Sequence, residues 1–80
     1  MLRINFKDED TLLEGETYLE IFEELQEYSF LPEDDLETFV KRFLKKIQKF
    51  VNKEVNTSFS GYEAAAKELI RVGVFEEVRI

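Results

Sequence analysis

The sequence predicts one α+β domain over residues 1–80, with a small three-stranded sheet in the order β-β-α-α-α-β, helices packed on one face, and a dominant, long second helix. Three observations predict this fold. Residues 2–6 alternate between apolar and polar side chains, three later segments repeat apolar residues at helical spacing, and the last residues return to a strand pattern. The composition is 44% hydrophobic and includes eight Phe, which supplies one core at this length.

The first two strands form a predicted hairpin. Leu2, Ile4 and Phe6 share one face of the first strand, with polar residues between them. Residues 7–10 are polar and predict a turn, and residues 11–14 predict the returning strand.

The first helix is expected over residues 18–28. Thr17 and Glu20 have the spacing of a capping box, in which each side chain accepts a hydrogen bond from a free backbone N–H at the helix start. Pro32 suits the first position of the second helix, because a residue there needs no intrahelical hydrogen bond. Three acids are then expected in its first turn, where the helix dipole favours negative charge: Glu33, Asp34 and Asp35.

The second helix is the most strongly patterned element of the chain. Apolar residues recur at i, i+3, i+4 and i+7 along one side, which predicts a core-facing arc made of Leu36, Phe39, Val40, Phe43, Leu44, Ile47, Phe50 and Val51. Basic residues occupy a separate arc, made of Lys41, Arg42, Lys45, Lys46, Lys49 and Lys53. The segregation predicts one buried face and one basic face.

The third helix is expected over residues 61–72, behind a second capping box formed by Ser60 and Glu63. Gly73 is placed for a left-handed C-cap. Residues 74–80 predict a closing strand, which we expect to pair with the first strand. Two of its apolar residues share one face: Val78 and Ile80.

The composition excludes several kinds of chemistry. The chain has no Cys, His or Trp, which excludes disulfides, zinc fingers, histidine bases and Cys–His nucleophiles. The acids that begin at Asp8 do not form an EF-hand loop, because Leu12 and Leu13 stand where that loop needs a ligand and a glycine. The sequence also lacks a glycine-rich phosphate loop. We therefore expect no enzymatic activity, no cofactor and no metal.

Charge is divided along the chain, although its net value is −7 with 18 acids and 11 bases. Residues 8–38 contain acids and no base, whereas residues 41–53 contain bases and no acid. Solvated surfaces usually intermix the two signs. The division predicts an acidic end and a basic stripe, which could steer a charged partner or a second copy in head-to-tail contact.

The sequence therefore predicts a small non-enzymatic interaction module that binds a protein partner or itself through the charged surface of the second helix. The candidate partner-binding residues are Arg42, Lys45, Lys49, Lys46 and Lys53. A basic face that is only solvated would show the same pattern. The chain has no apolar run long enough for a membrane span and no signal-peptide pattern, so we expect a cytoplasmic protein without a membrane partner.

Two alternatives stay open. The same basic residues could contact nucleic acid phosphates. A DNA-mimicking regulatory protein would instead use the acids Glu20, Glu23, Glu24, Glu27, Asp34, Asp35 and Glu37. Eight Phe also suggest an apolar dimer patch, for which the candidates at element ends are Phe30, Leu31, Phe59 and Phe75.

Overall fold

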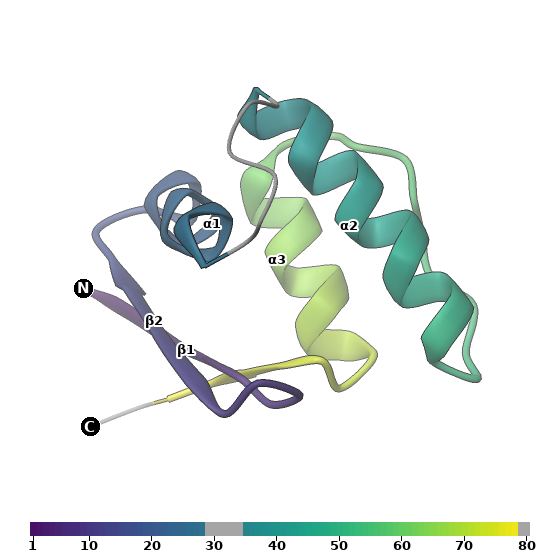
Figure 1. The fold of residues 1–80 in the computed structure, drawn as a ribbon, viewed down its shortest axis with the longest axis horizontal. Coiled ribbons are helices and arrows are strands. Elements are labelled where there is room, and N and C mark those ends of the chain that lie inside the picture. Colours follow the sequence, from purple (N-terminus) through teal and green to yellow (C-terminus); the bar gives the residue numbers. More distant parts are fainter. Residues whose placement is uncertain (29–34, 79–80) are drawn as a thin grey trace.

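The computed structural model describes residues 1–28 and 35–78, and it confirms the expected α+β order. Figure 1 shows the sheet nearly edge-on, with the helices on one side of it. The described elements are β1 (Leu2–Phe6), β2 (Thr11–Gly15), α1 (Tyr18–Glu27), α2 (Leu36–Phe50), α3 (Tyr62–Arg71) and β3 (Phe75–Glu77).

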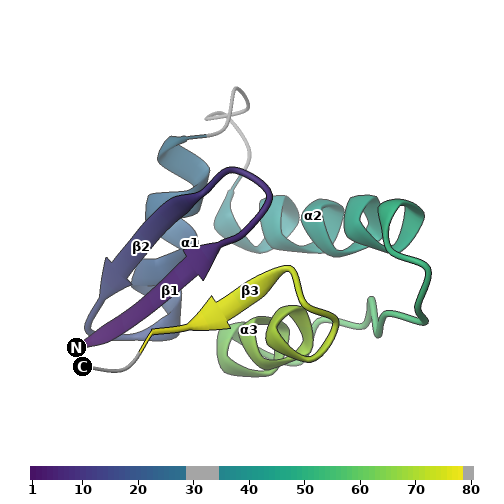
Figure 2. The same cartoon turned by 90° about the horizontal axis from the view of Figure 1, so that it is seen from below.

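The sheet has the order β2-β1-β3, and both of its strand pairs are antiparallel. The predicted pairing of the last strand with the first is therefore confirmed. Ile4 is aligned with Leu13 on one side and with Glu77 on the other. Figure 2 shows the sheet in front and the helices behind it. The alternation of β1 turns Ile4 toward the helices, and the residue is fully buried there.

Gly15 ends β2 where the chain turns into α1. A Cβ atom on Gly15 would lie 2.7 Å from the Cβ of Glu20, so a larger residue would collide with the first turn of the helix. Glycine thus lets α1 begin close against the edge of the sheet. The Thr17 cap is confirmed, because its hydroxyl oxygen accepts a hydrogen bond from the Glu20 N–H at 3.3 Å. The Glu20 carboxylate accepts its hydrogen bond from Glu16 instead of Thr17.

The starts of α2 and α3 correct two predictions. Asp35 is the N-cap of α2, so it precedes the first turn; Pro32, Glu33 and Asp34 lie outside the described residues. The carboxylate of Asp35 accepts hydrogen bonds from the hydroxyl and the N–H of Thr38, and these bonds lower its pKa.

The prediction of a capping box formed by Ser60 and Glu63 is wrong. Gly61 is the N-cap of α3, with φ at 124° and no side-chain cap bond, because the chain turns into the helix through a conformation that favours glycine. Glu63 instead forms an ion pair with Lys67.

The C-cap at Gly73 is confirmed. Its φ is 88°, its N–H donates to Ile70, and the N–H of Val74 donates to Leu69. This pair of bonds is a Schellman motif, which ends α3 and directs the chain into β3. β3 is shorter than predicted, since it ends at Glu77; Val78 is partly exposed and Ile80 lies outside the described residues.

Aromatic rings join the sheet to the helices. Phe43 of α2 meets Phe6 of β1 edge-on at 5.7 Å between ring centroids, and its ring lies 6.3 Å from that of Phe75. Phe75 also packs against Phe22 of α1. The expectation of an exposed Phe75 is wrong, because only 1% of it is exposed. Phe59 is partly buried against Tyr62, and Phe30 and Leu31 lie outside the described residues.

The predicted core-facing arc of α2 is confirmed except at Phe50, the last residue of the helix. Four of its side chains are buried: Phe39, Val40, Leu44 and Ile47. Leu36, Phe43 and Val51 are partly buried against this core. Phe50, which was predicted to face the core, is 73% exposed. Figure 2 shows the reason: the C-terminal end of α2 extends past the sheet and α3, so neither of them covers it.

We expect Phe43→Ala to lower the free energy of unfolding by about 3 kcal/mol, because it removes a ring that contacts both the sheet and α2 itself. Phe50→Ala is the matched control, and we expect it to cost less than about 0.5 kcal/mol because that ring is exposed. Urea denaturation followed by circular dichroism measures both. Equal losses in the two variants would contradict this account of the core.

Candidate functional site

The N-terminal half of α2 has its charges compensated. Lys41 pairs with Glu37 at 3.0 Å, and the ammonium nitrogen of Lys41 also lies 6.0 Å from the centroid of the Phe59 ring. Arg42 is exposed and already has an interaction partner. The predicted basic face is therefore not uniform, since its first two members are engaged within the molecule.

The C-terminal half of α2 and the bend behind it carry the remaining lysines of the predicted site. We call this group the lysine strip: Lys45, Lys46, Lys49 and Lys53. All four are exposed, and the structure gives none of them an ion pair within residues 1–28 and 35–78. Lys53 was predicted to lie on the helix arc, but it follows the end of α2 by three residues. The structure thus places four of the five candidate residues at one end of α2.

Phe50 belongs to the same surface, and the sequence pattern assigned it to the core. It lies one helical turn after Lys46, so the two exposed side chains are neighbours on the same side of the helix. The lengths of the predicted elements could have indicated that Phe50 is exposed. A helix of 15 residues is about 22 Å long, whereas a strand of five residues spans about 17 Å, so one end of α2 must overhang the sheet.

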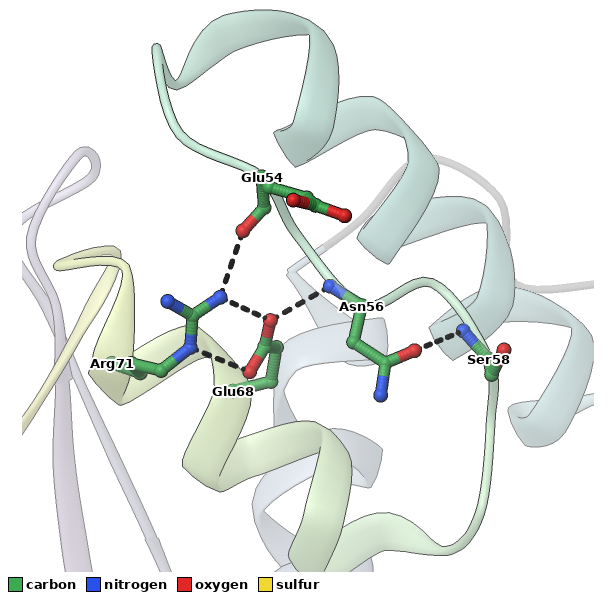
Figure 3. A network of polar contacts seen from close by, with 5 residues as sticks. All are labelled: Glu54, Asn56, Ser58, Glu68 and Arg71. Atoms are coloured by element: carbon green, nitrogen blue, oxygen red, sulfur yellow. Dashed lines mark hydrogen bonds and ion pairs between the residues drawn. The ribbon is translucent and has the colours of Figure 1, made fainter.

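The segment between α2 and α3 positions this surface. Figure 1 shows α2 and α3 running in the same direction, so the connection must return along the length of α2. Val55 anchors that segment in the core. Polar contacts hold the segment against α3, as Figure 3 shows. The Glu68 carboxylate accepts hydrogen bonds from Nε and Nη2 of Arg71, at 2.9 and 2.6 Å, and from the N–H of Asn56 at 2.7 Å.

The Glu68 network is completed by two further bonds. Nη2 of Arg71 donates to the carbonyl oxygen of Glu54 at 2.7 Å, and the Asn56 side chain accepts a bond from the N–H of Ser58. The bonds from Arg71, followed by that from Asn56, lower the pKa of Glu68 to about 2. The same pairing raises the pKa of Arg71. Both charges therefore persist at neutral pH and keep the returning segment fixed.

Many acids of the DNA-mimicking alternative are used within the fold. The Glu24 carboxylate accepts a hydrogen bond from the N–H of Glu14, and that of Glu20 accepts one from Glu16. The first bond satisfies an N–H group of β2, which is an edge strand, and the second lies in the turn from β2 into α1. Asp35 caps α2, Glu37 pairs with Lys41, and Asp34 lies outside the described residues.

Two acids of that set keep an exposed position on α1, Glu23 and Glu27, and the described part of the chain gives neither an ion pair. Glu23 lies near the starts of α2 and α3. Burial first, and then the charges of Glu37, Asp35 and Glu23, raise the pKa of Tyr62. The starts of α2 and α3 and the outer side of α1 thus form the acidic end of the molecule.

Other kinds of site are not found in the described residues. Within them, no group of three or more acidic side chains is placed to hold a metal ion. None of the helices described there is both long and apolar enough to cross a bilayer. What the arrangement offers is an ionic surface with one exposed ring, suited to an anionic partner.

We expect Glu68→Gln to lower the free energy of unfolding by about 1–2 kcal/mol at pH 7, because it removes the charge that binds Arg71 and the segment at Asn56. The folded pKa of Glu68 is depressed to about 2, so its contribution is present above the unfolded pKa of about 4.3 and is lost as the pH falls from there toward 2. Urea denaturation of both proteins across this range measures the difference.

Glu63→Gln is the matched control, because Glu63 is also an acid of α3 paired with a base, but both partners are largely exposed. We expect a loss below about 0.5 kcal/mol for this variant. A stability difference between the parent and Glu68→Gln that is as large at pH 2 as at pH 7 would show that the charge of Glu68 contributes nothing.

Comparison of the chain with models of protein families, with curated proteins and with solved structures finds no match in any of the three. The assignment of a function therefore depends on the surface chemistry of this chain alone.

Proposed function

We propose that the protein is a small non-enzymatic interaction module that binds an acidic surface of a partner protein through the lysine strip and Phe50. One observation carries the proposal. Four bases elsewhere pair with carboxylates: Arg3, Lys41, Lys67 and Arg71. Within the described residues of this acid-rich chain, Lys7 is an isolated base without an ion pair, whereas the strip gathers four such lysines at one end of α2. A base left unpaired in such a chain is available to an external anion.

Phe50 supports a protein as the partner. Protein interfaces combine an apolar or aromatic anchor with a charged rim, and the exposed Phe50, one helical turn after Lys46, provides that combination. A nucleic acid would extend past the strip in both directions. Along α2 its phosphates would meet Asp35 and Glu37, which repel them. A short acidic segment of a protein would fit within the strip. We also propose that the protein acts in the cytoplasm.

The test is a charge reversal of the strip. We expect Lys45→Glu/Lys49→Glu to abolish capture of a specific protein from nuclease-treated lysate by the immobilised chain, because the reversal puts repulsive charge at the centre of the surface. The control is Lys7→Glu/Lys67→Glu, which changes the net charge equally at exposed positions on other elements. Mass spectrometry of the captured proteins measures both.

Two outcomes would contradict the proposal. One is that the strip variant and the control capture the same proteins in the same amounts. The other is that a labelled oligonucleotide binds the wild type, that the strip reversal abolishes this binding, and that no protein is captured. The second outcome would assign the strip to nucleic acid.

A further inference from the structure

We propose that a partner of the lysine strip is a second copy of this chain, which offers the outer side of α1 as the acidic counterpart. The inference rests on the proposed function, since it uses the same strip and names what occupies it. We call the counterpart the α1 ridge: Leu19, Glu23 and Glu27. Charge complementarity between two surfaces of the same molecule carries the inference.

The α1 ridge is open to a partner. Its members are spaced by four residues, so they lie in line along one side of the helix. Glu23 and Glu27 are exposed, and Leu19 is 41% exposed beside them. Two other acids of α1 accept backbone hydrogen bonds within the molecule: Glu24 accepts one from Glu14 of β2, and Glu20 accepts one from Glu16 in the turn after β2. The ridge therefore keeps its charge for an external contact.

The strip and the ridge match in spacing as well as in charge. Lys45 and Lys49 are four residues apart on α2, as Glu23 and Glu27 are on α1, and four residues of helix correspond to about 6 Å. If the two helices lie antiparallel, Lys49 faces Glu23 and Lys45 faces Glu27. The same arrangement brings Leu19 toward the end of α2 that carries Phe50, so both exposed apolar side chains lie at the same end of the contact.

A single molecule cannot make this contact with itself. Figure 1 shows α1 and the C-terminal end of α2 on opposite sides of the molecule. The two surfaces are different patches, so the contact is head-to-tail: one copy keeps a free ridge and the other keeps a free strip. The net charge of −7 opposes close approach of two copies, and we therefore expect a weak, concentration-dependent association.

The test uses two charge-reversed variants and sedimentation velocity. We expect the wild type to gain mass with concentration at low salt and to be monomeric at 1 M salt, where screening acts over about 3 Å. Lys45→Glu/Lys49→Glu has two acidic surfaces and Glu23→Lys/Glu27→Lys has two basic ones, so each alone should be monomeric. Their equimolar mixture should associate, because each variant complements the other.

Two further variants test whether the association depends on the strip itself and not on net charge alone. Lys7→Glu/Lys67→Glu should associate like the wild type, apart from its greater net charge. Phe50→Ala should weaken association without a change of charge, and circular dichroism melts should show that every variant is folded. A wild type that stays monomeric at all concentrations, or a mixture that stays monomeric, overturns the inference. Loss of lysate capture in the strip variant, with a monomeric wild type, would leave the proposed function standing and remove the second copy as partner.

Discussion

The packing of the Phe43 ring on the sheet orients everything that α2 presents to solvent. The ring meets Phe6 and Phe75, which belong to adjacent antiparallel strands, so it fixes α2 against both. Residues on the far side of the helix are then directed outward. The exposure of the lysine strip is thus a consequence of an aromatic contact made by the opposite face of the same helix.

The acids and the bases of this chain have different roles. Several acids have structural roles in the described part of the molecule. Asp35 caps α2, Glu24 accepts a hydrogen bond from an N–H of the edge strand β2, and Glu20 accepts one from the turn after β2. Glu68 holds the segment between α2 and α3. These roles need a hydrogen-bond acceptor, which a carboxylate provides. The lysines of the strip have no such structural role among the described residues. For this reason we propose a binding role for them.

Local chemistry makes much of the fold predictable from sequence. The hairpin, the Thr17 cap, the Gly73 cap and the apolar arc of α2 each depend on residues close together in the chain, and each is confirmed. Two errors are local, at the starts of α2 and α3, where Asp35 and Gly61 are the N-caps. The others concern distant parts. Phe50 has the periodicity of a core residue, but the sheet does not reach it.

The other errors that concern distant parts have the same origin. Phe75 is at the end of an element, where exposure was expected, but pairing with β1 places it at the centre of the core. The basic face of α2 was predictable as a set, whereas its division into an engaged and an open half was not. That division follows from Glu37 and from Phe59, which only the folded chain brings beside Lys41.

The pairing of β1 with β3 has a consequence for biosynthesis. β1 emerges from the ribosome before β3, so for 32 residues after Phe43 is added the nascent polypeptide holds Phe6 and Phe43 without the Phe75 ring that packs against them. The hairpin of β1 and β2 and the helix α1 can form from local contacts. The sheet is completed only by the later, long-range pairing of β3 with β1. Until residues 75–77 are available, the nascent chain therefore carries an incomplete apolar core that is open to chaperones.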